Sequence, residues 1–202
     1  MTEAKHYFDR WMITAWASLF IGLMIAALLA TFGAGERGLH LVIRSTAQTS
    51  FVLFTSAFIA SPLLKLWPTS ATRWLRANRR YIGVSFAVSH ICHGAAIIAL
   101  GVITSGASLE VPAVVGGSLI YVIIITMAVT SFDRTTRWMG QRAWHRLHST
   151  GMYVLWAIFA LAYAGRAVNS ILYVPFALVV IAAILLRVAA SNSALRRKAA
   201  GA

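Results

Sequence analysis

Six long stretches without a charged side chain constrain the fold more than any other feature of this sequence. Each has at least nineteen residues and contains no Asp, Glu, Lys or Arg: 11–35, 45–64, 81–109, 111–132, 147–165 and 167–186. About twenty apolar residues in an α-helix cross the hydrocarbon core of a bilayer, and lipid offers no hydrogen-bond partner to an irregular backbone. The pattern therefore predicts an all-α membrane protein built as a bundle of six transmembrane helices.

The composition agrees with a membrane protein and argues against a soluble one. Hydrophobic residues make up 59% of the chain and charged residues 11%, whereas a soluble domain carries about 25% charged residues. A net charge of +13 would suggest nucleic-acid binding in a soluble chain, but basic loops are common in membrane proteins. We therefore expect the lipid bilayer as a partner and no nucleic acid. Because Cys92 is the single cysteine, no intramolecular disulfide is expected.

The basic residues predict how the helices are oriented. Of the eighteen Lys and Arg residues, fifteen lie in the N-terminus, the second and fourth connections and the C-terminus. Only Arg37, Arg44 and Arg166 fall on the other side. The positive-inside rule then places both termini in the cytoplasm. We expect a cytoplasmic N-terminus over residues 1–10, a transmembrane domain over 11–190 and a basic cytoplasmic tail over 191–202.

Four of the six histidines fall inside or at the edge of predicted spans as two i, i+3 pairs, His90 with His93 and His145 with His148. Residues three apart share a helix face, and an ionisable residue within a span indicates a functional site. Two facing neutral imidazoles make an axial pair for haem iron, and we expect His93 and His148 to be that pair. The alternative for His93 is a neutral histidine bonded to a Ser or Thr of a neighbouring helix. His90 and His145 lie one turn nearer the cytoplasm, where a bond to a haem propionate or lipid headgroup is favoured over alternative ligation.

Two segments carry a resemblance to a known family. Residues 79–83, followed by His93, resemble the Arg-Arg-x-Leu-Gly…His signature of the ferric reductase-like transmembrane domain. Residues 144–153 are similar to that family's Trp-x-x-Leu-His-x-x-x-Tyr segment, with Tyr153 one position later. The resemblance covers about residues 10–190, and in size and layout it is nearest to the MsrQ-like haem-binding subunits of bacterial inner membranes.

The resemblance implies specific roles for these residues. His93 corresponds to the haem ligand of the third helix and His148 to the first histidine of the fifth. Arg79 and Arg80 would face haem propionates or the cytoplasmic surface. Leu161 stands where the family often has a second histidine of the fifth helix, which favours one haem b over two.

These expectations combine into a functional hypothesis. The chain would be a multi-pass b-type cytochrome of the bacterial inner membrane. It would carry electrons from a separate cytoplasmic flavin protein or quinol to an outer acceptor: a periplasmic reductase, ferric iron or oxygen. Whether the haem subunit is itself catalytic stays open, as does a flavin or quinone site among the helices. Two alternatives remain, a histidine-dependent proton or metal-ion transporter and a structural subunit without chemistry.

Overall fold

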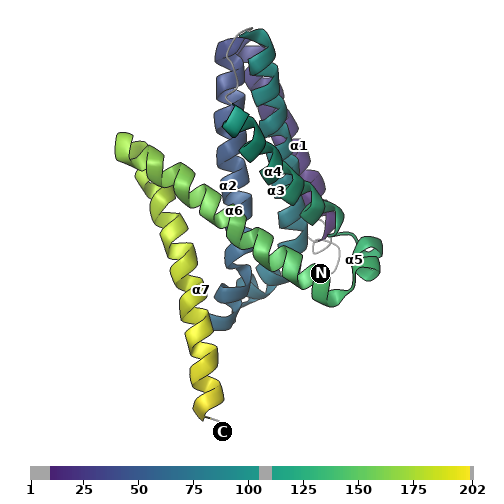
Figure 1. Ribbon diagram of the computed structural model, residues 1–202, viewed down its shortest axis with the longest axis vertical. Helices are drawn as coiled ribbons and strands as arrows, with labels where there is room; N and C mark the ends of the chain where they lie inside the picture. Colours follow the sequence, from purple (N-terminus) through teal and green to yellow (C-terminus); the bar gives the residue numbers. More distant parts are fainter. Residues whose placement is uncertain (1–9, 105–110, 201–202) are drawn as a thin grey trace. The chain divides into compact units, whose positions relative to one another are not determined.

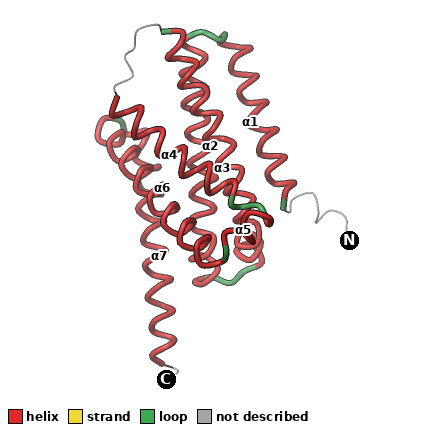
Figure 2. The backbone as a smooth tube through the Cα atoms, turned by 45° about the vertical axis from the view of Figure 1, so that its right-hand side comes forward, coloured by secondary structure: helices red, strands yellow, loops and turns green. Residues whose placement is uncertain are grey.

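The computed structural model describes residues 10–104 and 111–200, with residues 111–116 and 194–200 described by their backbone only. Seven α-helices and one 3-10 turn follow along this part of the chain (Figure 1): α1 Trp11–Phe32, α2 Glu36–Leu66, α3 Ser70–Ile103, α4 Val111–Val129, α5 Asp133–Met139, α6 Gln141–Asn169, η1 Ile171–Tyr173 and α7 Val174–Ala200. Figure 2 shows helices joined by short loops and no strand in the described residues. The predicted all-α class is therefore confirmed.

Five helical segments are long and apolar enough to cross a bilayer: Trp11–Phe32, Glu36–Leu66, Ser70–Ile103, Gln141–Asn169 and Ile171–Ser193. The predicted span 111–132 has a different form. Its described part, Gly117–Val129, continues after a short break into Asp133–Met139, and the two helices meet at an angle of 103°. The described chain thus has five membrane-length helices, or six if the bent pair is one span, as a multi-pass membrane protein requires.

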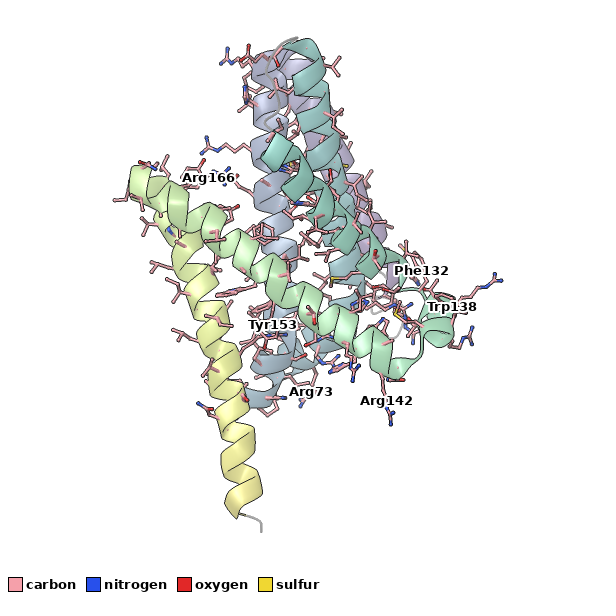
Figure 3. The ribbon with its side chains drawn as sticks, viewed as in Figure 1. Arg73, Phe132, Trp138, Arg142, Tyr153 and Arg166 are labelled. Carbon is pink, nitrogen blue, oxygen red and sulfur yellow. The ribbon has the colours of Figure 1, made fainter. Side chains whose placement is uncertain are left out.

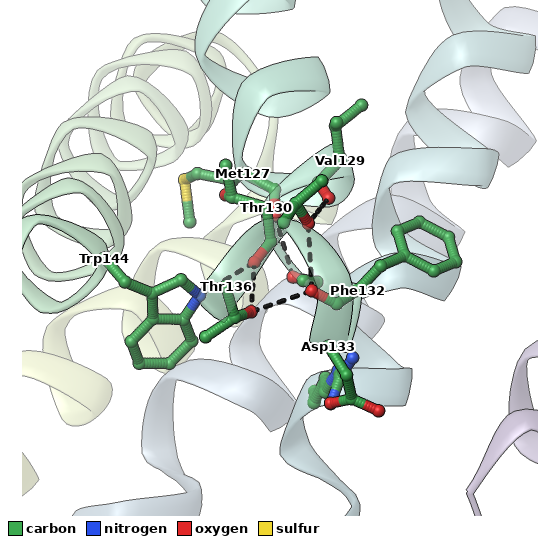
Figure 4. Close-up of polar contacts among 10 residues, drawn as sticks. Met127, Val129, Thr130, Phe132, Asp133, Thr136 and Trp144 are labelled. Carbon is green, nitrogen blue, oxygen red and sulfur yellow. Dashed lines mark hydrogen bonds and ion pairs between the residues drawn. The ribbon is translucent and has the colours of Figure 1, made fainter. Parts of the chain in front are cut away.

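Side chains satisfy the carbonyl groups at the bend between α4 and α5 (Figure 4). The last carbonyls of a helix lack intrahelical partners. Here the Thr130 carbonyl accepts a hydrogen bond from Trp144 Nε1 at 2.9 Å and another from Thr136 Oγ1 at 2.8 Å. Thr135 Oγ1 donates in the same way to the Val129 carbonyl. The charge-free stretch 111–132 ends at this break, and its hydropathy gives no sign that the chain bends there.

Trp144→Phe should destabilise the bend by removing one hydrogen-bond donor. We expect the free energy of unfolding in detergent to fall by about 1 kcal/mol, because the Thr130 carbonyl loses a partner. Trp138→Phe is the matched control, since Trp138 lies on α5 with 87% of its surface exposed (Figure 3). Equal losses of stability in the two variants would show that the Trp144 hydrogen bond does not hold the bend.

Glycine and proline, rather than charged residues, mark the helix ends. Gly33 ends α1 and Gly140 separates α5 from α6, both with φ near +80°, a conformation that glycine adopts readily. Pro68 lies in the connection between α2 and α3. The predicted spans 45–64 and 147–165 are thus the apolar parts of the longer helices α2 and α6. The predicted span 81–109 is likewise the apolar part of α3 up to Ile103, and residues 105–110 lie outside the described chain.

The described chain divides into two compact units, and each is described by itself. Unit 1 comprises Met1–Phe54 and Arg80–Trp144, and unit 2 comprises Thr55–Arg79 and His145–Ala202. The termini predicted as cytoplasmic lie partly outside the description, since residues 1–9 and 201–202 are not included. Arg79 and His148 belong to unit 2, whereas His93 belongs to unit 1.

Small polar side chains fill the contact between α2 and α3 in unit 1. Thr46, Ser50, Ser85 and Ser89 are completely buried. Ser50 Oγ donates to Ser89 Oγ at 3.0 Å, and Ser89 Oγ donates to the Thr46 carbonyl at 3.1 Å. Large apolar side chains are meanwhile exposed on several helices, among them Phe20, Ile98, Leu119 and Leu161. Small polar residues inside and apolar residues outside are the arrangement expected of helices that pack within lipid.

Candidate functional site

His93 is held by the backbone of α2 through one ring nitrogen. Its Nδ1 lies 3.0 Å from the Ile43 carbonyl oxygen and 3.3 Å from Thr46 Oγ1. Because a carbonyl oxygen only accepts hydrogen bonds, the contact with Ile43 requires the proton to be on Nδ1. A neutral His93 then carries its lone pair on Nε2. This is the arrangement of metal-ligating histidines, whose second nitrogen donates to a carbonyl or carboxylate.

The sequence around His93 explains why its ring faces α2. Ser85, Ser89 and His93 follow one another at i, i+4 spacing, so they share one face of α3. Ser89 hydrogen-bonds to α2 residues, which fixes that face toward α2 and carries His93 with it. Thr46 is itself oriented, because its hydroxyl donates to the Val42 carbonyl at 2.6 Å. His93 thus belongs to the same polar contact between α2 and α3 as Ser89, one helical turn further along α3.

His90 lies beside His93, as the i, i+3 spacing predicts. The two imidazole rings stack with centroids 5.1 Å apart. Phe86 and Tyr121 complete the surroundings of His90, with ring centroids at 5.4 and 5.3 Å. Tyr121, from α4, also donates a hydrogen bond from its hydroxyl to the His90 carbonyl at 3.1 Å. His90 therefore packs among aromatic rings at the junction of α3 and α4.

Gly94 allows Tyr121 to approach α3 this closely. A Cβ atom at Gly94 would lie 2.5 Å from the Tyr121 hydroxyl oxygen and 2.6 Å from the ring carbon that bears it. Contacts of this length do not occur between real side chains, so any other residue at this position must displace Tyr121. The glycine thereby sets the distance between α3 and α4 next to the paired histidines.

The second histidine pair lies on α6 in unit 2. His148 is half-buried and His145 is exposed. In the same unit Arg79 donates from Nη1 to Ser61 Oγ at 3.0 Å. The prediction that His148 is the second axial ligand concerns a residue of unit 2, while the hydrogen-bonded His93 lies in unit 1. The pairing of these two histidines stays a prediction.

Arg80 has different partners from its neighbour Arg79. It forms an ion pair with Asp133, with Nη1 2.5 Å from Oδ1. Its guanidinium also lies 5.8 Å from the ring centroids of both Trp11 and Tyr81. Trp11 in turn stacks on Phe132, with ring centroids 5.0 Å apart. Arg80 therefore connects α3 with α1 and with the start of α5. Its predicted contact with a haem propionate is untested.

The described residues bring no group of potential protein metal ligands together. No three His, Cys, Asp or Glu side chains gather within the described residues to hold a metal ion. A zinc site takes three or four protein ligands, whereas the haem macrocycle supplies four of the six iron ligands itself. Ligation of a haem iron by His93 stays a prediction.

Several residues of the site were not found from the sequence. Ile43 and Thr46, which hold His93, come from α2, and no motif links them to α3. Tyr121 and Gly94 form a contact between α3 and α4 that only the packing reveals. The sole signal for Thr46 was a polar residue inside the charge-free stretch 45–64. No protein-family model, curated protein or solved structure matches this chain.

Proposed function

We propose that this protein is a membrane b-type cytochrome that carries electrons across the bilayer. His93 would hold a single haem b through its imidazole, and His148 is the proposed second ligand. The haem, when bound, supplies an iron centre that takes up and releases one electron. The chain's own residues ligate the iron, fix the orientation of the imidazole and surround the site with apolar helices.

One observation carries this proposal: His93 Nδ1 lies 3.0 Å from the Ile43 carbonyl. That contact puts the proton on Nδ1 and restricts rotation of the ring, so Nε2 would be the nitrogen available to the haem iron. The proposal is strengthened by the resemblance of residues 79–93 and 144–153 to the ferric reductase-like transmembrane domain, whose members hold haem with histidines at these positions.

The charge distribution fits the proposed direction of electron flow. The basic N-terminus, connections and tail lie on the cytoplasmic side, where they attract an acidic flavin protein, and salt weakens such attraction. A quinol is the other class of donor. The acceptor on the outer side is a periplasmic reductase, ferric iron or oxygen, and the membrane is the bacterial inner membrane.

Electron transfer through vesicles tests the proposal. Haem-loaded protein is reconstituted into liposomes that enclose ferricyanide, and dithionite is added outside. We expect the enclosed ferricyanide to be reduced much faster than in protein-free liposomes, with one electron crossing for each ferricyanide consumed. His93→Ala should lower the rate to the protein-free level, whereas His40→Ala should not, because His40 is exposed and next to Glu36. Proton or zinc flux by haem-free protein, with no electron transfer by loaded protein, would support the transporter instead.

The predicted orientation can be tested with single cysteines. Cys92→Ala provides the background, and Arg73, Arg142 and Arg166, all exposed (Figure 3), are replaced by cysteine one at a time. We expect a membrane-impermeant maleimide to label the Arg166→Cys protein in intact spheroplasts. The Arg73→Cys and Arg142→Cys proteins should react only after the membrane is permeabilised. The reverse pattern would contradict cytoplasmic termini.

A further inference from the structure

Unit 2 contains basic residues but no acidic side chain to neutralise them. Its two segments, 55–79 and 145–202, hold ten Lys and Arg residues and no Asp or Glu. Most of these basic residues lie toward helix ends, where their charges can reach water. Arg187 is different, because it lies within the apolar segment Ile171–Ser193 and is only half-exposed. A cation at this position is costly unless an anion or an aromatic ring compensates it.

Two aromatic rings hold the Arg187 guanidinium. Its central carbon lies 4.0 Å from the centroid of Phe58 and 4.8 Å from that of Tyr153. The two rings meet edge to face, with centroids 6.0 Å apart and planes at 88°. Phe58 is completely buried, so the guanidinium covers a ring that no water reaches. Cation–π contacts of this kind fix the position of the group but leave its charge unneutralised.

Arg79 presents a second guanidinium to the same part of α2. It donates from Nη1 to Ser61 Oγ at 3.0 Å. Ser61 follows Phe58 by three residues, so the two share one face of α2. Arg187 and Arg79 therefore lie within about one helical turn of each other along that face. In the described part of the chain no carboxylate pairs with either arginine, since the ion pairs there are Glu36–His40 and Asp133–Arg80.

We propose that Arg187 and Arg79 together bind the phosphodiester of an anionic phospholipid. A guanidinium has five N–H donors in a planar fork that matches two phosphate oxygens, and one donor of Arg79 is occupied by Ser61. The rings of Phe58 and Tyr153 orient the Arg187 guanidinium, and Ser61 orients the Arg79 guanidinium. The four helices that supply these residues, α2, α3, α6 and α7, are apolar and of membrane length, so the ligand meets them from the bilayer. This site shares Arg79 with the predicted haem propionate contact, whereas Arg187 and Phe58 have no role in haem ligation, and haem-loaded protein separates the two anions.

The binding of defined lipids tests this inference. Purified protein in a neutral detergent is titrated with phosphatidylglycerol, phosphatidylcholine or inorganic phosphate, and bound lipid is counted by native mass spectrometry. We expect the wild-type protein to prefer phosphatidylglycerol over phosphatidylcholine. Arg187→Gln should weaken phosphatidylglycerol binding by about tenfold or more, since a charged hydrogen-bond partner is lost. Arg73→Gln is the control and should bind like the wild type, because Arg73 is exposed and bonds to the Pro68 carbonyl.

Other outcomes of the titration would overturn the inference. Equal binding of the two lipids by the wild-type protein would do so without any variant. Saturation by inorganic phosphate at the concentration that phosphatidylglycerol requires would indicate a simple anion site. If haem loading abolished phosphatidylglycerol binding, the anion at these arginines would be a haem carboxylate. Should Arg187→Gln not fold, Arg187→Lys keeps the charge without the planar fork, and unchanged phosphatidylglycerol binding in it would contradict the proposed role.

Discussion

His93→Ala is expected to yield protein without bound haem. Removing a residue that only orients a metal ligand costs about 10–100-fold in metal affinity, and removal of the ligand itself should cost more. The pyridine haemochrome assay on purified protein measures the haem per chain. His40→Ala is the matched control, since His40 lies on the exposed side of α2. Full haem content in His93→Ala would exclude this histidine as a ligand.

Thr46→Val removes a group that helps to orient the His93 ring but leaves His93, the proposed haem ligand, in place. The hydroxyl of Thr46 lies 3.3 Å from His93 Nδ1, but the Ile43 carbonyl is closer and remains after the substitution. We expect the variant to bind haem with lower affinity, within the range of about 10–100-fold, and with a shifted reduction potential. An unaltered affinity and potential would mean that Ile43 alone orients the ring.

Gly94→Ala is expected to destabilise unit 1. The added methyl would lie 2.5 Å from the Tyr121 hydroxyl, so the Tyr121 ring must shift. Overpacking of this kind costs about 1–3 kcal/mol, which denaturant unfolding in detergent can resolve. At Gly83 on the same helix a Cβ would meet no described atom within 4 Å. Gly83→Ala should therefore be neutral or stabilise by up to about 1 kcal/mol.

A second substitution tests whether contact with Tyr121 causes the loss of stability in Gly94→Ala. In the Gly94→Ala background, Tyr121→Leu removes the ring that the methyl would contact. The double variant should recover part of the lost stability, although the hydrogen bond from Tyr121 to the His90 carbonyl is lost too. Strictly additive losses in the two substitutions would show that Gly94 and Tyr121 do not interact.

The helical class and most of the helix positions could be predicted because the lipid constraint acts on sequence directly. A charge-free stretch of about twenty residues has few alternatives to a membrane-length helix. The same constraint does not determine where a helix ends, and α2, α3 and α6 extend past their predicted spans. The lipid constraint does not predict bends either, because the break after Val129 is stabilised by Trp144 and Thr136, which follow it in the sequence.

The site was predictable only in part for a related reason. The histidines could be found because imidazole is rare and costly inside a span, and their spacing placed His90 and His93 on one face. Their partners are a backbone carbonyl at Ile43 and common residues such as Thr46 and Tyr121, which no pattern distinguishes. Arg187 is one of the basic residues that the sequence assigns to the cytoplasmic side. Its contacts with Phe58 and Tyr153 depend on helix packing, so no sequence pattern indicates them.

The visible spectrum of the purified protein tests the proposed cytochrome most directly. The protein is produced with a supply of haem precursor, purified in detergent and measured oxidised and after reduction with dithionite. We predict a sharp reduced α-band of b type and about one haem per chain by the pyridine haemochrome assay. A featureless visible spectrum from folded, haem-supplied protein would contradict the account and direct attention to proton or metal-ion transport by the same histidines.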